Sequence, residues 1–187
     1  MKTMLRHSLL VSCAMALGGW PPGVLADGHD SHAQRSDGPA TGLIKDVRDA
    51  TARFRDPAVA MAESYAPFLG CVSGPVVGAM GIHFVNGPLV EDGVLDAARP
   101  EILVYDPQEN GRLRLVAVEY LVIAAAWDVD HTAAPVLSGQ VFNYVSSPNR
   151  YGLPPFYELH AWAWKDNPLG AFVDWNPKVS CDDYSPE

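Results

Sequence analysis

A β-hairpin between residues 101 and 123 is the feature that most constrains the fold of this chain. Two apolar runs, 102–105 and 113–123, flank the segment Asp106-Pro107-Gln108-Glu109-Asn110-Gly111. Apolar runs separated by a short turn that contains Pro, Asn and Gly are typical of two antiparallel strands. The chain is therefore expected to fold around an antiparallel sheet.

Further strands and two helices are expected on either side of this hairpin. Apolar runs predict strands at 79–85, 136–145 and 156–164. Upstream of them, apolar residues recur at helical spacing between 43 and 54, and Asp56-Pro57 opens a second short helix through about residue 65. The predicted fold class is α+β, with two N-terminal helices packed on a curled antiparallel sheet of about five strands.

The N-terminal segment has the pattern of a secretory signal peptide. Lys2 and Arg6 precede a short apolar run at 8–17, and Val24-Leu25-Ala26 is a small-residue cleavage site. The expected organisation is a signal peptide at 1–26, a disordered leader at 27–42 and a single globular domain at 43–187. The mature protein is then periplasmic or secreted. The alternative is a lipoprotein anchored at Cys13, although the apolar run before it is short.

Cleavage after Ala26 would create a second, separate candidate for metal binding at the new N-terminus, Asp27-Gly28-His29. An α-amine, two amide nitrogens and an imidazole at the third position can surround Cu(II) or Ni(II) in a square plane. A shift of one residue in the cleavage site abolishes this geometry. The alternative is a solvated tail whose histidines bind nothing.

Charge and apolar length exclude two classes of partner. The formal net charge is −9, and an acidic chain repels the phosphates of nucleic acid. No segment after the signal peptide is long and apolar enough to span a membrane. A small-molecule ligand is the partner that we expect, and the oligomeric state is not specified by the sequence.

Cys71 and Cys181 are the two cysteines that remain after removal of the signal peptide. In an oxidising compartment they are expected to form one disulfide, with two free thiols as the alternative. Neither belongs to a C-x-x-C pair, so a redox-active role is not indicated. The disulfide would hold residues 165–181, which contain two Asn-Pro turns, as a cover loop over the last strand.

Three ionisable side chains interrupt strands that are otherwise apolar, namely His83, Glu119 and His160. A buried carboxylate is costly unless it is paired or hydrogen-bonded. On its face of the strand Glu119 is expected to have aliphatic neighbours only: Leu115, Ala117 and Leu121. We therefore expect the three side chains to converge on a divalent metal, which sets a geometric condition: they must lie within about 5 Å of one another.

Two imidazoles and a carboxylate that leave coordination positions open suit Zn(II) or non-haem Fe(II), and Mn(II) and Cu(II) are compatible as well. Glu158 and Tyr120 are candidate catalytic groups for proton transfer beside such a metal. Two alternatives need no metal. The histidines could be hydrogen-bonded structural groups, and Glu119 could pair with Arg112, Arg114 or Arg150.

Tryptophans point to a ligand cleft beside these groups. Strand alternation places Trp162 and Trp164 on the same face as Glu158 and His160, and Trp175 lies in the cover loop. Together they could line a cleft for a small apolar molecule or a sugar. Packing in the core is the alternative for each of them.

Four segments, GAMGIHFVN, RPEILVYDP, VEY and LHAWAWKDNPLGAFVDWNPKVSC, resemble an uncharacterised family of exported bacterial proteins. The resemblance extends over roughly residues 44–181. It implies export and a single domain, and it assigns no catalytic residue.

The leading hypothesis is an exported metal-binding protein with a two-His/one-Glu site beside an aromatic cleft. Whether it is a small metal-dependent enzyme is left open by the sequence. The competing hypothesis is a non-catalytic binding module for a small apolar or sugar ligand. A third is an envelope protein without a small-molecule site.

Overall fold

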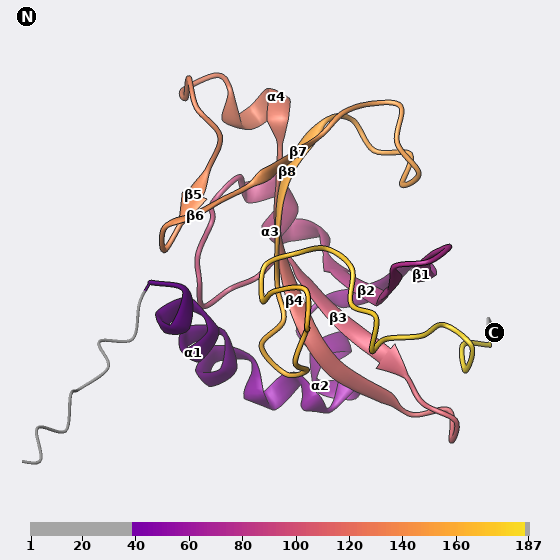
Figure 1. Cartoon of the computed structure of the whole chain (residues 1–187). Coiled ribbons are helices and arrows are strands. Elements are labelled where there is room, and N and C mark those ends of the chain that lie inside the picture. Colours follow the sequence, from indigo (N-terminus) through magenta and orange to yellow (C-terminus); the bar gives the residue numbers. More distant parts are fainter. Residues whose placement is uncertain (1–38, 186–187) are drawn as a thin grey trace, which may run out of the picture. The chain divides into compact units, whose positions relative to one another are not determined.

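The computed structural model describes residues 39–185 (Figure 1). The predicted signal peptide, the leader up to residue 38 and the His29 motif lie outside the described residues. The helical elements are α1 (Pro39–Thr51), the 3-10 helix η1 (Ala52–Arg55), α2 (Pro57–Ala62), α3 (Gly87–Asp92) and α4 (Ala124–Trp127). The strands are β1 (Tyr65–Gly74), β2 (Gly78–Asn86), β3 (Ile102–Pro107), β4 (Leu113–Ile123), β5 (Val136–Leu137), β6 (Gln140–Val141), β7 (Asn143–Val145) and β8 (Phe156–Ala161).

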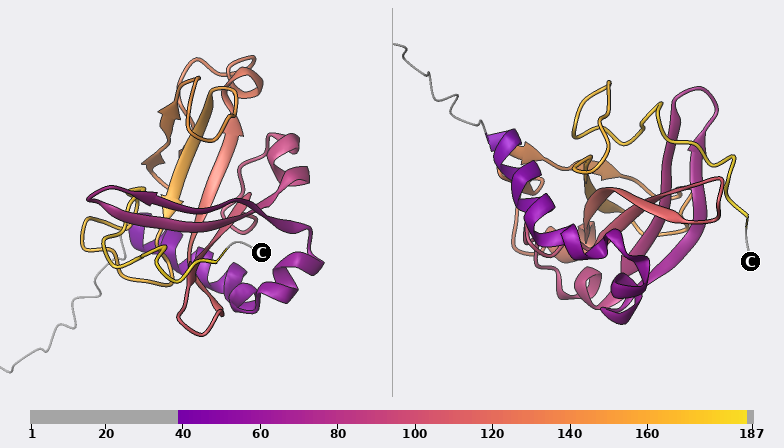
Figure 2. Two further views of the ribbon diagram at one scale, coloured as in Figure 1. Left: turned by 90° about the vertical axis from the view of Figure 1, so that its right-hand side faces the viewer. Right: turned by 90° about the horizontal axis from the view of Figure 1, so that it is seen from below.

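Six strands form one antiparallel, curled sheet in the order β1-β2-β3-β4-β8-β7. The α+β class and the antiparallel sheet are thus as predicted, with six strands where the sequence indicated about five. Figure 2 shows the curl: β1 and β2 cross β4 and β8 at a large angle. The hairpin is β3–β4, and its strands match the predicted apolar runs.

One face of the sheet, which we call the helix face, packs against α1, η1 and α2. Leu43, Val47 and Phe54 from these elements are buried against Tyr105 and Tyr120 from the sheet. The Tyr105 hydroxyl donates a hydrogen bond of 2.7 Å to the carbonyl oxygen of Phe54, so that the polar end of this buried ring is satisfied. The opposite face, which we call the site face, carries His83, Glu119 and His160.

Several stretches differ from the sequence prediction. Helix α1 begins at Pro39, inside the predicted leader 27–42. Residues 65–74 form β1, which contains Pro67 and Gly70, although the second helix was expected to reach about residue 65 and no strand was predicted here. A strand can contain both residues here because β1 is an edge strand and bulges between Phe68 and Cys71. The predicted strand 136–145 is broken into three short pieces, of which only β7 joins the main sheet.

A β-bulge in β4 changes which residues share a face with Glu119. Tyr105 pairs with Leu115 and Val104 pairs with Ala117, so Val116 is the extra residue. Alternation restarts after the bulge, and Leu115 consequently lies in the helix-face core. The expectation that Leu115 would lie beside Glu119 is therefore wrong.

The C-terminal segment 165–181 is fixed to the sheet at several points. Asn176 forms two backbone hydrogen bonds with Ala79, of 3.1 and 3.3 Å. Gly78 has φ +88°, and a Cβ there would lie 2.2 Å from the Asn176 carbonyl oxygen, so the close approach of this segment requires glycine. Cys71 and Cys181 lie at disulfide distance, with sulfur atoms 1.98 Å apart, as predicted. Within residues 39–185, none of the helices combines the length and apolar character needed to cross a membrane.

Candidate metal centre

His83, Glu119 and His160 come together on the site face. Each offers a ligand atom, and these atoms all lie within 4.8 Å of one another. All three side chains are buried, with exposed fractions of 7% for His83, 4% for Glu119 and 0% for His160. The geometric condition set by the sequence analysis is met, and this buried group could hold a metal ion.

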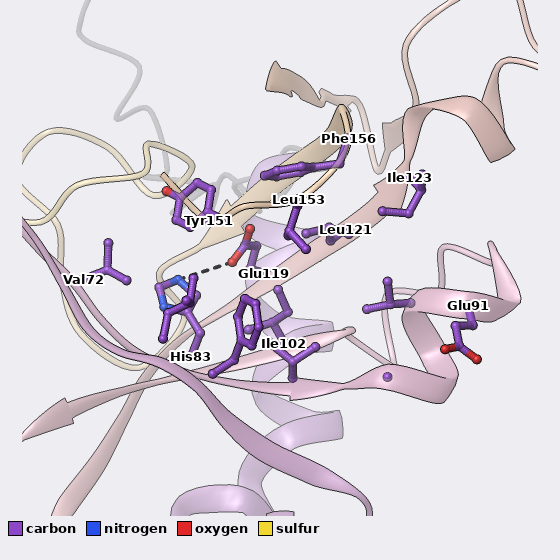
Figure 3. Close-up of a pocket in the computed structure, with 15 residues that line it drawn as sticks. Val72, His83, Glu91, Ile102, Glu119, Leu121, Ile123, Tyr151, Leu153 and Phe156 are labelled. Carbon is purple, nitrogen blue, oxygen red and sulfur yellow. Dashed lines mark ion pairs between the residues drawn. The ribbon is translucent and has the colours of Figure 1, made fainter. Parts of the chain in front are cut away.

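The sheet brings these residues together in two different ways. Glu119 and His160 are direct cross-strand partners on β4 and β8. His83 lies on β2, which is separated from β4 by β3, so the two strands are about 10 Å apart. The side chains of His83 and Glu119 lean toward each other over β3 and face one another in Figure 3.

The distances within the group are too long for good hydrogen bonds. Glu119 Oε2 lies 3.4 Å from His83 Nε2 and 3.7 Å from His160 Nε2. Good N–H···O hydrogen bonds are about 2.7–3.2 Å long, whereas two ligand atoms each about 2.1 Å from a tetrahedral ion are about 3.4 Å apart. The spacing thus fits atoms arranged around one ion better than atoms bonded to each other.

The imidazoles are short of hydrogen-bond partners. Among the described residues, both ring nitrogens of His160 and Nδ1 of His83 are buried without one. Burial lowers the pKa of His83 to about 4, and burial together with the neighbouring His83 lowers that of His160 to about 3. Both rings are therefore neutral at pH 7, which is the form that binds a metal.

Glu119 has a second carboxyl group beside it. Burial, and then the charge of the neighbouring Glu158, raise the pKa of Glu119 well above its usual range. Burial also raises the pKa of Glu158, to about 7. The protonated form of Glu119 is thus favoured, because two neighbouring buried carboxylates do not readily both ionise.

A second group of possible ligands shares His160 with the first. Glu158, His160 and Asp174 also offer atoms within 4.8 Å of one another. Asp174 Oδ1 lies 3.8 Å from His160 Nδ1, the nitrogen that faces away from Glu119. Asp174 belongs to the C-terminal segment 165–181, which therefore contributes directly to this site.

An apolar cavity of about 180 Å³ opens onto His83 and Glu119. Figure 3 shows these two side chains facing each other among aliphatic and aromatic side chains, with the carboxylate of Glu91 on the side away from them. The lining residues are Phe68, Leu69 and Val72 from β1; His83 and Val85 from β2; Gly87, Val90 and Glu91 from α3; Ile102 from β3; Glu119, Leu121 and Ile123 from β4; and Tyr151, Leu153 and Phe156.

Tyr120 is not a neighbour of this centre, and its predicted role in proton transfer is wrong. It follows Glu119 in β4, so its side chain points to the helix face. Its hydroxyl donates a hydrogen bond of 2.8 Å to the carbonyl oxygen of Ala97. Of the two predicted proton-transfer residues, only Glu158 lies in the site.

The predicted tryptophan cleft does not form. β8 ends at Ala161, and a turn in which Ala163 N–H bonds to the Ala161 carbonyl breaks the alternation. Trp164 consequently packs on the helix face, where its Nε1 donates to Thr51 Oγ1. Trp162 stacks on His160 with ring centroids 6.3 Å apart but does not line the cavity.

Trp175 lies outside the cavity as well. It is half-buried against Gly74 of β1, and the Arg150 guanidinium lies 5.7 Å from its ring centroid. Trp162 instead anchors the segment 165–181, because its Nε1 donates to the carbonyl oxygen of Val173. Within that segment the Trp175 carbonyl oxygen accepts a hydrogen bond from Asn167 Nδ2. The aromatic side chains that do line the cavity are Phe68, Tyr151 and Phe156.

Sequence reasoning missed Asp174 and the residues of β1 and α3 that line the cavity. No pattern in the sequence marks Asp174, because its position depends on how the C-terminal segment lies over β8. The alternative in which Glu119 pairs with an arginine is not found: within residues 39–185, its ion-pair partners are the two histidines alone. Arg150 instead donates a hydrogen bond to the carbonyl oxygen of Ser73.

The fold and the site define an α+β protein with a buried His/Glu/His group that could hold a metal ion. Comparison of the chain with family models, curated proteins and solved structures finds no significant match.

Proposed function

We propose that this chain is an exported metal-binding protein in which His83, Glu119 and His160 hold one divalent transition metal. The observation that carries the proposal is a pair of buried imidazoles whose Nε2 atoms lie 3.4 and 3.7 Å from one carboxyl oxygen, while His83 Nδ1 and both nitrogens of His160 lack a hydrogen-bond partner among the described residues. Buried polar groups are almost always hydrogen-bonded, and those that are not commonly have a functional role. Two imidazoles and a carboxyl group are suited to one such role, the coordination of a metal ion.

The donor set favours some metals over others. Two imidazoles and one carboxylate, with coordination positions left open, suit Zn(II) and non-haem Fe(II) best. Mn(II) and Cu(II) accept the same donors. Because Glu119 must lose its proton to become a ligand, binding should release a proton and tighten as the pH rises.

We further propose that the centre is catalytic, as a small metal-dependent enzyme. A bound metal would act as a Lewis acid at the end of the apolar cavity that His83 and Glu119 line. Glu158, with a pKa of about 7, is suited to accept or donate a proton at neutral pH. The second candidate function, a binding module without catalysis, uses the same cavity and needs no metal.

Export is part of the proposal. It is supported by the N-terminal sequence pattern, by the resemblance to exported bacterial proteins and by the Cys71–Cys181 disulfide, since disulfides persist in oxidising compartments. N-terminal sequencing of the mature protein tests it. We expect the chain to begin at Asp27, and a mature protein that retains residues 1–26 would refute export by cleavage.

Elemental analysis of protein purified without chelator tests the metal function. We expect close to one equivalent of a transition metal, and loss of that metal in His83→Ala. His131→Ala is the matched control, because His131 is exposed and lies outside both ligand groups. Less than about a tenth of an equivalent, with no uptake on titration with Zn(II), Fe(II), Mn(II) or Cu(II), would refute the proposal.

A further inference from the structure

We propose that the apolar cavity is a binding site for one small, neutral molecule of single-ring size whose polar end faces His83 and Glu119. The position of that polar end rests on the proposed metal function, because the metal would be its partner. The binding of the apolar part does not depend on the metal.

The lining determines the chemical class of the ligand. Apart from His83, Glu119, Glu91 and the Tyr151 hydroxyl, the lining side chains are hydrocarbon. The Tyr151 hydroxyl lies 3.6 Å from Met80 Sδ. No lysine or arginine is among the lining residues of the described chain, so a carboxylate, sulfate or phosphate ligand would meet no protein cation there. An apolar molecule that carries no anionic group fits this lining, and a sugar, with hydroxyl groups all around its ring, does not.

The volume determines the size of the ligand. An apolar cavity of about 150 Å³ lined by Leu, Ile and Phe stays dry and binds benzene. The cavity here is slightly larger, at about 180 Å³, which leaves room for one ring and one short polar substituent. Its buried ionisable groups are His83 and Glu119, whereas Glu91 is exposed, so a ligand with a single hydroxyl, thiol or amine at one end matches both the polar and the hydrocarbon part of the interior.

A strained bulge in β1 adds an independent observation. Phe68 pairs with His83 and Cys71 pairs with Ile82, which leaves Leu69 and Gly70 unpaired between them. Leu69 has φ +61°, a left-handed conformation that costs energy for any residue with a Cβ. The chain holds this conformation where Phe68, 38% exposed, and Leu69, 53% exposed, line the cavity.

This bulge gives the cavity an entrance. Large apolar side chains that are both exposed and part of a cavity wall lie where the cavity meets solvent, and burial by an arriving ligand would stabilise them. Glu91 on α3 is the other exposed lining residue, and its charge would repel anions. The entrance and the interior therefore select for the same neutral, apolar class.

Calorimetric titration with benzyl alcohol tests the inference, with benzoate as the anionic comparison. We expect saturable one-to-one binding of benzyl alcohol to the metal-free protein, and at least tenfold weaker binding of benzoate. Leu153→Trp should weaken benzyl alcohol binding at least tenfold, because Leu153 is a half-buried lining residue and a larger side chain there fills the cavity. Val141→Trp, at an exposed position away from the cavity, is the matched control and should bind as the natural chain does.

Circular dichroism establishes first that each variant is folded. Should Leu153→Trp not fold, Val90→Phe fills the cavity from α3 and takes its place. Absence of saturable benzyl alcohol binding, or equal binding by the natural chain and a folded cavity-filling variant, overturns the inference. Benzyl alcohol binding by a chain that takes up no metal refutes the metal function and supports the inference. Metal uptake without benzyl alcohol binding supports the metal function and overturns the inference.

Discussion

Replacement of Glu119 by Gln separates a metal ligand from a structural carboxylate, because the two roles predict opposite results. Burial and Glu158 raise the pKa of Glu119, so the folded chain holds a proton that the unfolded chain releases. Its contribution to stability therefore falls as the pH rises above about 4.5. Without metal, Glu119→Gln should be at least as stable as the natural chain, and its advantage should grow toward pH 8. With metal, the natural chain should be the more stable one.

The size of the metal effect follows from linkage. At a metal concentration 100 times Kd, binding stabilises the folded state by about 2.7 kcal/mol. Loss of one of three ligands, on the order of 100-fold in affinity, would reduce this to about 0.4 kcal/mol at the same concentration. For a domain of about 150 residues, 1 kcal/mol shifts Tm by about 2–4 °C. The metal-induced shift should fall from about 5–11 °C to about 1–2 °C.

Differential scanning calorimetry with and without Zn(II), at pH 6 and pH 8, measures both effects. Glu109→Gln is the matched control, because Glu109 is exposed in the turn between β3 and β4 and undergoes the same chemical change. A metal-induced shift of the same size in Glu119→Gln and in the natural chain would refute Glu119 as a ligand. A Glu119→Gln variant that is much less stable than the natural metal-free chain at pH 8 would refute the burial argument.

Three further predictions concern other residues of the fold and site. Asp174→Asn should weaken metal binding about 10–100-fold in a competition titration, because the carboxylate 3.8 Å from His160 Nδ1 would orient the imidazole ring. An unchanged Kd would exclude Asp174 as a residue that orients His160. Burial raises the pKa of Glu101 to about 8, so the natural chain should become less stable between pH 5 and 8, where the unfolded chain releases a proton that the folded chain keeps. In urea unfolding, Glu101→Gln should make this decrease smaller by up to about 1.4 kcal/mol per pH unit. An unchanged dependence of stability on pH would count against the prediction. Cys71→Ser should lower the free energy of unfolding by about 2–5 kcal/mol, because the disulfide joins residues 110 apart in the chain. A loss well below that range in urea unfolding would show that the disulfide contributes little to stability.

Much of the sheet could be predicted because its signals are local. The two strands of the β3–β4 hairpin contain the apolar runs 102–105 and 115–118, and Pro107 and Gly111 mark the turn between the strands. The convergence of His83, Glu119 and His160 could be predicted from the cost of burial: they are polar residues in largely apolar strands, and the sheet brings their side-chain nitrogen and oxygen atoms within 4.8 Å of one another.

The remaining features could not be predicted because they depend on contacts between distant segments. The turn after Ala161 sends Trp164 to the helix face, where Thr51 satisfies its indole N–H. The cavity needs side chains from β1 and α3, and β1 contains a proline and a bulge that hide its strand pattern. Asp174 approaches His160 because hydrogen bonds at Val173 and Asn176 fix the C-terminal segment on either side of it.

The bulge at Val116 determines where this protein can tolerate insertions and deletions. The turn at 108–111 lies beyond the paired part of the hairpin, so a change in its length leaves the face of every later residue in β4 unaltered. A single deletion between Ala117 and Glu119 would instead turn Glu119 to the helix face and bring Tyr120 to the site face. Homologous chains that keep the site are therefore free to differ in length at the hairpin tip, and the spacing from Val116 to Glu119 should be invariant among them.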